Sequence, residues 1–392
     1  MRIAYVCSDP GIPVFGRKGA SVHVQAVLRV LASRGVEVHL VAGRVGGEVP
    51  SGLADVTVHV LPEVPKGDAA AREIAAQTSD TAVAGVLDQL LVTGPLDLVY
   101  ERCSLWGRTA TAWSDAAGVP SVLEVNAPLV DEQAEHRVLV DRASADGVAA
   151  AALSAAAAVV CVSDGVAAWA RALSTHPERV VVVPNGVDTE RVRPAARPVA
   201  PVDAAPFCLG FVGTLKPWHG VEVLLDALAR LQRDDPAGYR MLVVGDGPQA
   251  DALRTRAESA GVGPLVEWTG SVDPDAVPAL LHRMDAAVAP YPSREGFYFS
   301  PLKVYEYLAA GLPVVASAVG QLPEVLDHGG LGVLVEPGRA DVLAAALADL
   351  RADLPRRVAL RRLAREAAVA RHSWDRVVDR TLLAVSGDGA AA

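Results

Sequence analysis

Cysteine is scarce in this chain. Four cysteines, Cys7, Cys103, Cys161 and Cys208, are spread over 392 residues, and no two of them are close in the sequence. A zinc site needs cysteines at short spacing, and a disulfide framework needs a denser set. We therefore expect four buried, free thiols, with neither a structural metal nor a disulfide bond.

The chain also lacks long hydrophobic runs and an excess of positive charge. No apolar run reaches about 18 residues, so no transmembrane helix is predicted. Residues 1–6 read directly into a strand and lack the cleavage site of a signal peptide, so a cytoplasmic location is expected. The formal net charge of −10 argues against a general nucleic-acid binder, which needs a basic surface.

Short apolar strands that alternate with helices are abundant. Residues 2–8 are predicted as a strand, residues 21–34 as a helix and residues 36–41 as the next strand. This order is typical of a Rossmann-type unit, in which ligands bind at the carboxyl ends of parallel strands. The intervening loop contains Gly16 and Gly19, whose spacing differs from the dinucleotide fingerprint, so a dinucleotide site is not expected there.

The same alternation starts again after residue 206. A chain of this length is long for one domain and sufficient for two. We predict an α/β fold with two Rossmann-like domains, residues 1–190 and residues 207–372, joined by a proline-rich linker at 191–206. Within the first domain, the alanine-rich residues 131–158 are expected to be helical.

Residues 293–311 carry the strongest local signal. We expect a loop up to Ser300 and a helix that begins at Pro301 and stops before Gly311. Serine is a good N-cap, proline is favoured at the first helical position, and glycine suits a left-handed residue after a helix. The free amides and positive dipole end of such a helix attract an anion, typically a phosphate.

Two charged side chains add to this helix start. Lys303 lies in the first turn, and Glu306 lies one turn later on the same face. The pair suits a nucleotide, with Lys303 on the diphosphate and Glu306 on the ribose hydroxyls. An ordinary surface helix with a salt-bridged pair has the same spacing, so both interpretations stay open.

The segment 300–303, followed by Glu306 and residues 309–315, resembles the donor-binding helix of the family 4 glycosyltransferases. The likeness extends over nearly the whole chain and includes a hinge-like tetrapeptide at 185–188. It implies a GT-B fold, in which two Rossmann-like domains face each other across a cleft and a C-terminal helix, here residues 373–386, crosses back to the N-terminal domain. It also implies sugar transfer from a nucleotide-diphosphate donor with retention at the anomeric carbon, the first domain binding the acceptor and the second the donor.

The resemblance also implies a set of donor-binding residues. These are Gly16, Gly213, Lys216, His219, Val272, Ser300, Pro301, Leu302, Lys303 and Glu306. The chain departs from the family pattern where an arginine and a lysine commonly clamp the diphosphate, because Thr214 and His219 stand there. We expect Lys216 and Lys303 to form the clamp with His219 assisting. The alternative role for His219 is a backbone hydrogen bond at a helix start.

A second departure concerns a pair of glutamates that the family separates by seven residues. Glu306 matches the second, but Tyr298 stands at the position of the first. The role of that first glutamate, a contact with the hydroxyls of the donor sugar, is assigned to Glu295. Many family members carry a histidine near Asn126; an amide can bind a hydroxyl there but cannot shuttle a proton. A loop-capping role for Asn126 is the alternative.

The predicted catalytic residues are therefore Glu295, Lys216, Lys303 and Asn126, and the predicted acceptor-binding residues are Lys18, Gly19 and Asn126. Because the lysines would stabilise the leaving diphosphate, neither a metal nor another cofactor is expected. The expected partners are a nucleotide-diphosphate sugar and a saccharide or small-molecule acceptor, with no nucleic acid and no integral membrane segment; a homodimer is left open. A non-catalytic nucleotide-sugar-binding protein and a GT-B epimerase or phosphorylase are the alternatives.

Overall fold

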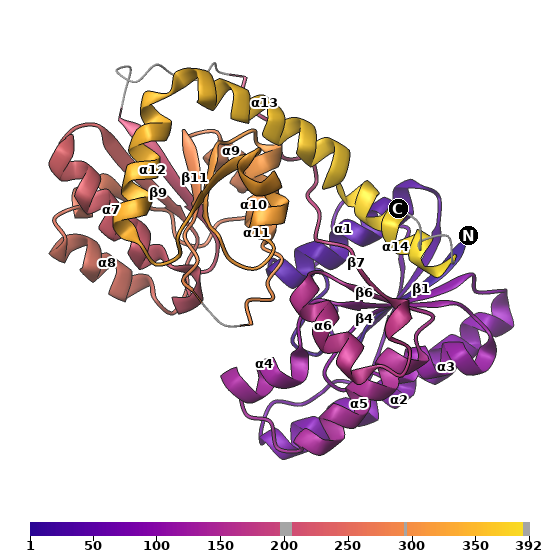
Figure 1. Ribbon diagram of the computed structural model, residues 1–392. Coiled ribbons are helices and arrows are strands. Elements are labelled where there is room, and N and C mark those ends of the chain that lie inside the picture. Colours follow the sequence, from indigo (N-terminus) through magenta and orange to yellow (C-terminus); the bar gives the residue numbers. More distant parts are fainter. Residues whose placement is uncertain (197–205, 294–295, 387–392) are drawn as a thin grey trace. The chain divides into compact units, whose positions relative to one another are not determined.

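The computed structural model describes residues 1–196, 206–293 and 296–386. It divides into two compact units (Figure 1). Unit 1 comprises Met1–Pro184, Tyr298–Ser300 and the chain from Trp374 onward, and unit 2 comprises Asn185–Phe297 and Pro301–Ser373. The first boundary thus lies after Pro184 rather than at the predicted residue 190. Most of the predicted linker, residues 197–205, lies outside the described residues.

Unit 1 is built on a seven-stranded parallel sheet with the strand order β3-β2-β1-β4-β5-β6-β7. Its strands are β1 (Arg2–Cys7), β2 (Glu37–Ala42), β3 (Thr57–Val60), β4 (Leu98–Arg102), β5 (Ser121–Val125), β6 (Ala158–Cys161) and β7 (Val180–Val182). The strand order reverses between β1 and β4, and ligands of such sheets bind outside the carboxyl ends of the strands at this switch point.

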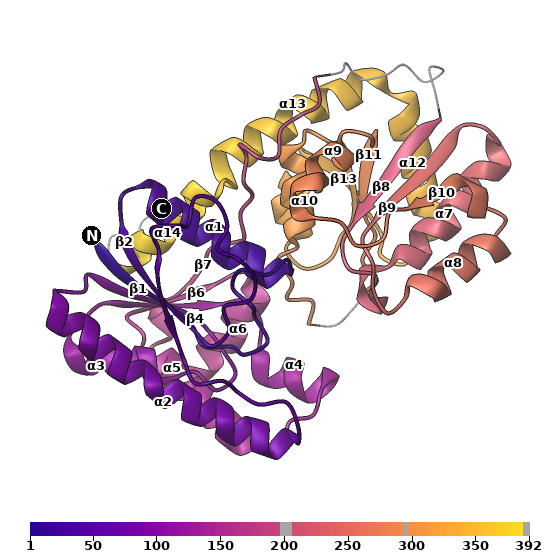
Figure 2. The ribbon, with the colours of Figure 1, turned by 180° about the vertical axis from the view of Figure 1, so that it is seen from behind.

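Helices cover both faces of this sheet. They are α1 (Gly19–Ser33), α2 (Ala69–Thr93), α3 (Thr109–Ala117), α4 (Leu129–His136), α5 (Arg142–Ala155), α6 (Asp164–Leu173) and α14 (Trp374–Val385). In both views α2, α3 and α5 lie on one face, and α1 and α14 lie on the other (Figures 1 and 2). The central strands β1, β4 and β5 are buried along almost their whole length, as expected for strands covered on both faces.

Unit 2 repeats the plan with six parallel strands in the order β10-β9-β8-β11-β12-β13. These are β8 (Phe207–Val212), β9 (Tyr239–Val244), β10 (Val266–Trp268), β11 (Ala286–Ala289), β12 (Val314–Ser317) and β13 (Gly332–Val335). The helices are α7 (Val221–Asp234), α8 (Ala250–Ser259), α9 (Val277–Leu281), α10 (Leu302–Ala309), α11 (Leu322–Val325), α12 (Ala340–Ala352) and α13 (Leu354–Arg371). Its switch point lies between β8 and β11.

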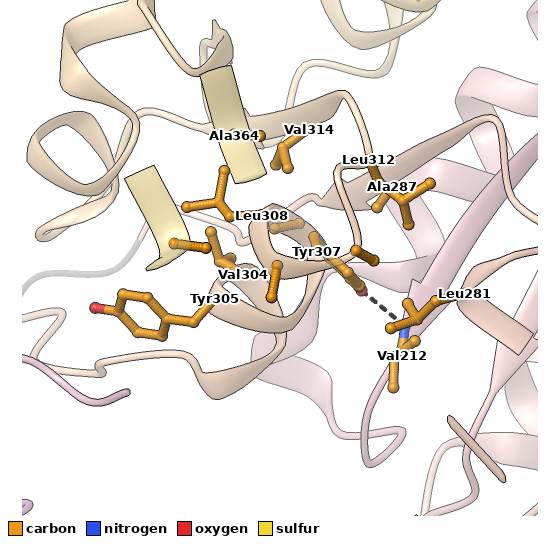
Figure 3. Packing of buried hydrophobic residues seen from close by; sticks show 14 of the residues in the cluster. Val212, Leu281, Ala287, Val304, Tyr305, Tyr307, Leu308, Leu312, Val314 and Ala364 are labelled. Atoms are coloured by element: carbon orange, nitrogen blue, oxygen red, sulfur yellow. Dashed lines mark hydrogen bonds between the residues drawn. The ribbon is translucent and has the colours of Figure 1, made fainter. Parts of the chain in front are cut away.

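Helix α10, which contains part of the predicted donor site, is deeply buried in unit 2. Val304, Tyr305, Tyr307 and Leu308 are fully buried in one apolar cluster on a face of the unit 2 sheet (Figure 3). The backbone N–H of Val212, at the end of β8, donates to the Tyr307 hydroxyl at 2.8 Å. This contact fixes α10 against the carboxyl edge of the sheet.

The start of α10 differs from the prediction, while its end agrees. The helix begins at Leu302, because Pro301 has an extended backbone (φ −77°, ψ 107°) and occupies the N-cap position, where no side chain caps the helix. Ser300 is therefore not the N-cap. At the other end Gly311 has φ +63°, and the amides of Gly311 and Leu312 donate to the carbonyls of Leu308 and Tyr307.

The predicted helical stretch at 131–158 is two helices, α4 and α5. The interruption is held by Glu73 of α2, whose carboxylate accepts from the amides of Val140 at 2.8 Å and Asp141 at 3.0 Å. Asp141 in turn caps α5 by accepting from the Ser144 amide at 2.9 Å. The break is thus a tertiary contact that the local sequence does not encode.

The chain passes from unit 2 back to unit 1 just before α14. The Trp374 ring packs edge-on against His23 of α1, with ring centroids 4.6 Å apart, and Arg34 pairs with Asp379 at 2.8 Å. Within unit 2, the amide of Val187 donates to the carbonyl of His372 at 2.8 Å. This backbone hydrogen bond links the segment that follows β7 to the segment that precedes α14. Helix α14 lies beside α1 in both views (Figures 1 and 2).

Two sequence features have a direct structural counterpart. All four cysteines carry free thiols; Cys7, Cys161 and Cys208 are buried, whereas Cys103 is only half-buried. Across the described ranges, no helix combines the length and apolar character needed to cross a membrane.

Candidate functional site

Lys303 is the centre of a candidate site in unit 2. Its side chain extends from the first turn of α10 and is only 9% exposed. Its Nζ lies 4.1 Å from the centroid of the Phe211 ring and 5.3 Å from that of Tyr291. Among the residues that the structure describes, this Nζ has no hydrogen-bond partner. The amine therefore lies against two aromatic rings, and no carboxylate of the described residues forms an ion pair with it.

Burial and the surrounding charges set the protonation of Lys303. Burial lowers its pKa from 10.5 to about 7, and the nearby Glu306 opposes this shift only in part. Gly213, which follows β8, lies directly against the amine, because a Cβ built there would be 2.8 Å from Nζ. The glycine leaves room beside a partly charged amine at the switch point of the sheet. An anion that entered this space would stabilise the protonated form.

His219 adopts the alternative role expected for it. Its ring Nδ1 is hydrogen-bonded to the carbonyl of Thr214, and the ring packs between Phe211 and Tyr291. Burial, together with the charge of Lys303, lowers the pKa of His219 to about 3. The imidazole is therefore neutral near pH 7 and does not supply the positive charge of a lysine. Nδ1 carries the proton donated to the carbonyl, which leaves Nε2 as an acceptor.

Lys216 is the second cation of this part of unit 2. It is half-buried, and its Nζ lies 4.6 Å from the centroid of the Trp218 ring. Among the described residues Lys216 forms no ion pair. It can therefore approach an anion without first breaking a salt bridge.

Glu306 does not form the salt bridge with Lys303 that the alternative interpretation of this helix expected. Its Oε1 instead accepts from Arg191 at 3.2 Å, and Arg191 also donates to the Pro274 carbonyl at 2.7 Å. Burial raises the pKa of Glu306, and Arg191 opposes that rise. The sequence offered no signal for this partner, because Arg191 lies in the stretch predicted as a linker.

The other predicted donor-site residues are placed as follows. Val272 is half-buried and packs against the same apolar cluster as α10. Gly16 lies in the loop after β1 of unit 1, where a Cβ would be 2.7 Å from Pro13 Cγ, so the close approach of the chain requires a glycine. Pro301 and Leu302 form the start of α10. Glu295, the proposed substitute for the first family glutamate, lies outside the described residues.

The carboxyl edge of the unit 1 sheet is organised by Glu124, a residue that sequence analysis missed. Four side chains donate to its buried carboxylate: Tyr100 at 2.6 Å, Arg102 at 2.8 Å, Asn126 at 2.6 Å and the His23 ring at 3.0 Å. Burial alone would raise the pKa of Glu124, but His23, Arg102 and Tyr100 lower it well below its usual range. A glutamate inside an otherwise apolar buried strand was the available signal, because such a charge must be paired.

Asn126 is therefore oriented by the protein itself. One N–H of its amide donates to Glu124, which leaves the second N–H and the carbonyl oxygen to meet another group. This contact fixes the orientation of the side chain and leaves both the acceptor-binding and the capping interpretation open. Lys18 and Gly19, the other predicted acceptor residues, lie at the start of α1, where Lys18 occupies the N-cap position.

Unit 1 also contains a cavity of about 640 Å³ beside its switch point. The Ser8 and Ser104 hydroxyls, which are 2.7 Å apart and follow β1 and β4, lie in its lining, as does Lys18. Asn126 and Gly19 are not among its lining residues. The volume lies in the range of small-molecule sites.

Glu101, in β4, should make the free energy of unfolding decrease as pH rises. It is fully buried, and burial together with Asp80 raises its pKa from 4.5 to about 8. Between those two pH values the folded chain holds a proton that the unfolded chain releases, so the free energy of unfolding decreases with pH. Glu101→Gln should stabilise the protein by several kcal/mol at about pH 8.5, at about 1.4 kcal/mol per pKa unit.

Urea unfolding of Glu101→Gln and wild type at about pH 5 and about pH 8.5 tests this expectation. The matched control is Glu63→Gln, which changes an exposed glutamate of the same unit. An equal effect of Glu101→Gln at both pH values would show that the carboxyl is not protonated on folding.

Comparisons with known proteins identify the family. Residues 17–191 match a family model described as Glycosyltransferase Family 4, and residues 206–353 match one described as Glycosyl transferases group 1. A D-inositol 3-phosphate glycosyltransferase from Geodermatophilus obscurus is 32% identical over 401 residues, which cover 93% of this chain and 84% of that protein. The chain belongs to glycosyltransferase family 4. The family resemblance predicted from residues 300–315 is thereby confirmed.

Other relatives of this family 4 chain match it over a shorter range. A GDP-mannose-dependent alpha-(1-6)-phosphatidylinositol monomannoside mannosyltransferase from Mycobacterium tuberculosis is 34% identical over 218 residues, which cover 53% of this chain and 56% of that protein. The chain therefore spans about half the length of that relative.

Solved structures show that the family 4 chain has the GT-B fold. Sucrose-phosphate synthase from Thermosynechococcus elongatus has a TM-score of 0.72 at 20% identity, with 100% of both chains covered. Anabaena Alr3699/HepE, solved in complex with UDP and glucose, has a TM-score of 0.72 at 20% identity, with 98% of this chain and 99% of that chain covered. At such identities the likeness establishes the fold and not the substrates.

Proposed function

We propose that this family 4 chain is a retaining glycosyltransferase that moves a sugar from a nucleotide-diphosphate donor to a hydroxyl of a saccharide or small-molecule acceptor, without a metal ion. The observation that carries the proposal is the buried amine of Lys303, which lies against Gly213 at the switch point of unit 2 and has no hydrogen-bond partner among the residues that the structure describes. A buried cation without a counter-charge is unfavourable, and a diphosphate would supply that charge.

In the proposed reaction the donor diphosphate lies at the start of α10, against Lys303 and near Lys216. The bond from the anomeric carbon to the diphosphate oxygen breaks, and its electron pair stays on the diphosphate. The two lysines stabilise this developing charge. The acceptor oxygen attacks from the same face, and its proton passes to the leaving phosphate. In this proposal Glu306 accepts from the ribose hydroxyls, and its hydrogen bond from Arg191 supports an ionised carboxylate there.

Calorimetry with UDP, GDP, ADP and dTDP tests the donor site. UDP and GDP come first, because a solved neighbour holds UDP and a relative is named for GDP-mannose. A nucleotide present at about 100 times its Kd should stabilise the protein by about 2.7 kcal/mol. Glu306→Ala should weaken binding of the preferred nucleotide. No response to any of the four would overturn the proposal, and unchanged turnover in EDTA is expected for a metal-independent enzyme.

A non-catalytic nucleotide-sugar-binding protein is the second candidate. The observation that favours it is the neutral, hydrogen-bonded His219 at a position where the family commonly carries a lysine. Slow hydrolysis of a bound nucleotide sugar to free sugar, or transfer to any acceptor, separates the two candidates. Tight nucleotide binding with neither reaction would favour the binding protein.

A further inference from the structure

The acidic and basic side chains that line the unit 1 cavity differ in how far the protein itself binds them. Four acidic side chains line it, and each accepts a hydrogen bond from the protein. Asp9 accepts from the Gly11 amide at 2.7 Å, and Glu132 accepts from the Tyr298 hydroxyl at 3.0 Å. Glu73 accepts from the two backbone amides of the segment between α4 and α5. These carboxylates therefore have structural partners already.

Asp80, the fourth acid, is also committed. One of its oxygens accepts from the amides of Arg108 and Thr109 at 3.2 and 3.0 Å and from the Thr109 hydroxyl at 2.6 Å. These donors lie at the start of α3, where the helix dipole also favours an anion. Burial raises the pKa of Asp80, and the hydrogen bonds from Thr109 and Arg108 oppose that rise.

Three basic side chains line the same cavity. Lys18 precedes α1, Arg72 lies in the first turn of α2, and Arg137 follows α4. Within the described part of the chain none of the three forms an ion pair. The guanidinium group of Arg137 lies 3.4 Å from the side-chain oxygen of Gln133. Three elements far apart in the sequence thus bring unpaired cations to one concave surface.

The polar floor of the cavity lies at the switch point. Ser8 and Ser104 are buried there, and their hydroxyls are 2.7 Å apart. A Cβ built on Gly107 would lie 2.4 Å from the Ser104 hydroxyl, 3.2 Å from the Ser8 hydroxyl and 2.8 Å from Glu101 Oε1. Three side-chain oxygens therefore converge on a residue without a side chain. Such a floor offers hydrogen bonds to hydroxyl groups.

We propose that this cavity binds an acceptor that carries both hydroxyl groups and an anionic group, such as a phosphate monoester or diester, with the anion held by Lys18, Arg72 and Arg137. The inference rests on the proposed function, since it defines the acceptor class of that reaction. Arginine suits the planar, bidentate recognition of phosphate oxygens, and the contact is charge-assisted. The hydroxyls of the acceptor would face Ser8 and Ser104.

Binding of soluble probes gives the first test. Glucose 6-phosphate, myo-inositol 1-phosphate and glycerol 3-phosphate are titrated by calorimetry against glucose, myo-inositol and glycerol. At least one phosphate ester should bind at least about tenfold more tightly than its neutral counterpart. Arg72→Gln and Arg137→Gln should each remove about tenfold or more of that affinity. The matched control is Arg108→Gln, which changes an exposed arginine of unit 1 that does not line the cavity.

A second arm distinguishes a free metabolite from a lipid headgroup. Vesicles of phosphatidylcholine with and without phosphatidylinositol are sedimented with the wild type and with Arg72→Gln. Retention on phosphatidylinositol vesicles alone, lost in the variant, assigns the anion to a lipid. Binding of a soluble ester alone assigns it to a free metabolite.

The proposal is overturned if no phosphate ester or phosphatidylinositol vesicle binds better than its neutral counterpart, or if the Arg72 and Arg137 variants bind as the wild type does. Nucleotide titration of the same variants keeps this result separate from the donor site. Intact nucleotide affinity together with lost phosphate-ester affinity supports the anionic acceptor. Intact nucleotide affinity without any phosphate-ester binding removes only the acceptor assignment.

Discussion

Lys303→Met should give a protein that is more stable than the wild type and that binds a nucleoside diphosphate about 10- to 100-fold more weakly. Methionine keeps the apolar contacts with Phe211 and Tyr291 but removes a buried amine that has no hydrogen-bond partner among the described residues. Affinity falls because a charge-assisted contact contributes about 1.5 to 3 kcal/mol. A gain in stability with a loss of binding is the signature of a functional group held at a cost to the fold.

The pH dependence of stability gives the same substitution a second readout. The pKa of Lys303 falls from 10.5 to about 7 on folding because of burial. Between about pH 7 and pH 10.5 the folded chain therefore binds fewer protons than the unfolded chain, and the free energy of unfolding rises with pH. This contribution should be absent in Lys303→Met, as measured by urea unfolding at several pH values.

Lys216→Met serves as the matched control for Lys303→Met. Lys216 is half-buried over Trp218 and, among the described residues, has no ion-pair partner, so its loss should weaken nucleotide binding with little change in stability. Nucleotide affinity that is unchanged in Lys303→Met would contradict the placement of the diphosphate at α10.

The second large effect is expected at Glu124. Glu124→Gln should destabilise unit 1 by about 3 to 5 kcal/mol, because it leaves the Arg102 guanidinium buried without its counter-charge. The Arg102→Met, Glu124→Gln double variant should lose less than the sum of the two single changes, since the pair is removed together. Denaturant unfolding measures each variant.

Acid should have a related effect on the wild type. The pKa of Glu124 is lower in the folded chain than in the unfolded chain, so its contribution to stability is present above about pH 4.5 and is lost as pH falls below that value. The control is Glu37→Gln, because Glu37 is an exposed partner of Arg2 and such solvent-screened pairs contribute little to stability. An effect of Glu124→Gln no larger than that of the control would show that Arg102 is solvated.

The local sequence predicted those features that local chemistry determines. The alternation of strands and helices, the position of α10 and its termination at Gly311 follow from periodicity and turn chemistry, and the structure confirms them. The start of α10 was placed one residue early, because proline tolerates both a first-turn and an extended conformation.

Contacts made across the fold were not predictable from spacing. Glu306 lies one turn from Lys303, yet its ion-pair partner is Arg191, which is 115 residues away in the sequence. The Glu124 network gathers donors from α1, β4 and the end of β5, and the cavity gathers Lys18, Arg72 and Arg137. Only the assembled sheet brings these side chains together.

Helix α14 has a consequence for how the protein is made. Trp374, Val377 and Val378 are buried, and the helix belongs to unit 1, although all of unit 2 precedes it in the chain. During synthesis from the N-terminus, the first residues of unit 1 leave the ribosome long before the helix that covers α1. Unit 1 therefore cannot complete its fold until unit 2 has been translated, and until then the apolar surface of α1 that α14 covers stays exposed. The second unit synthesised is thus the first that can finish folding.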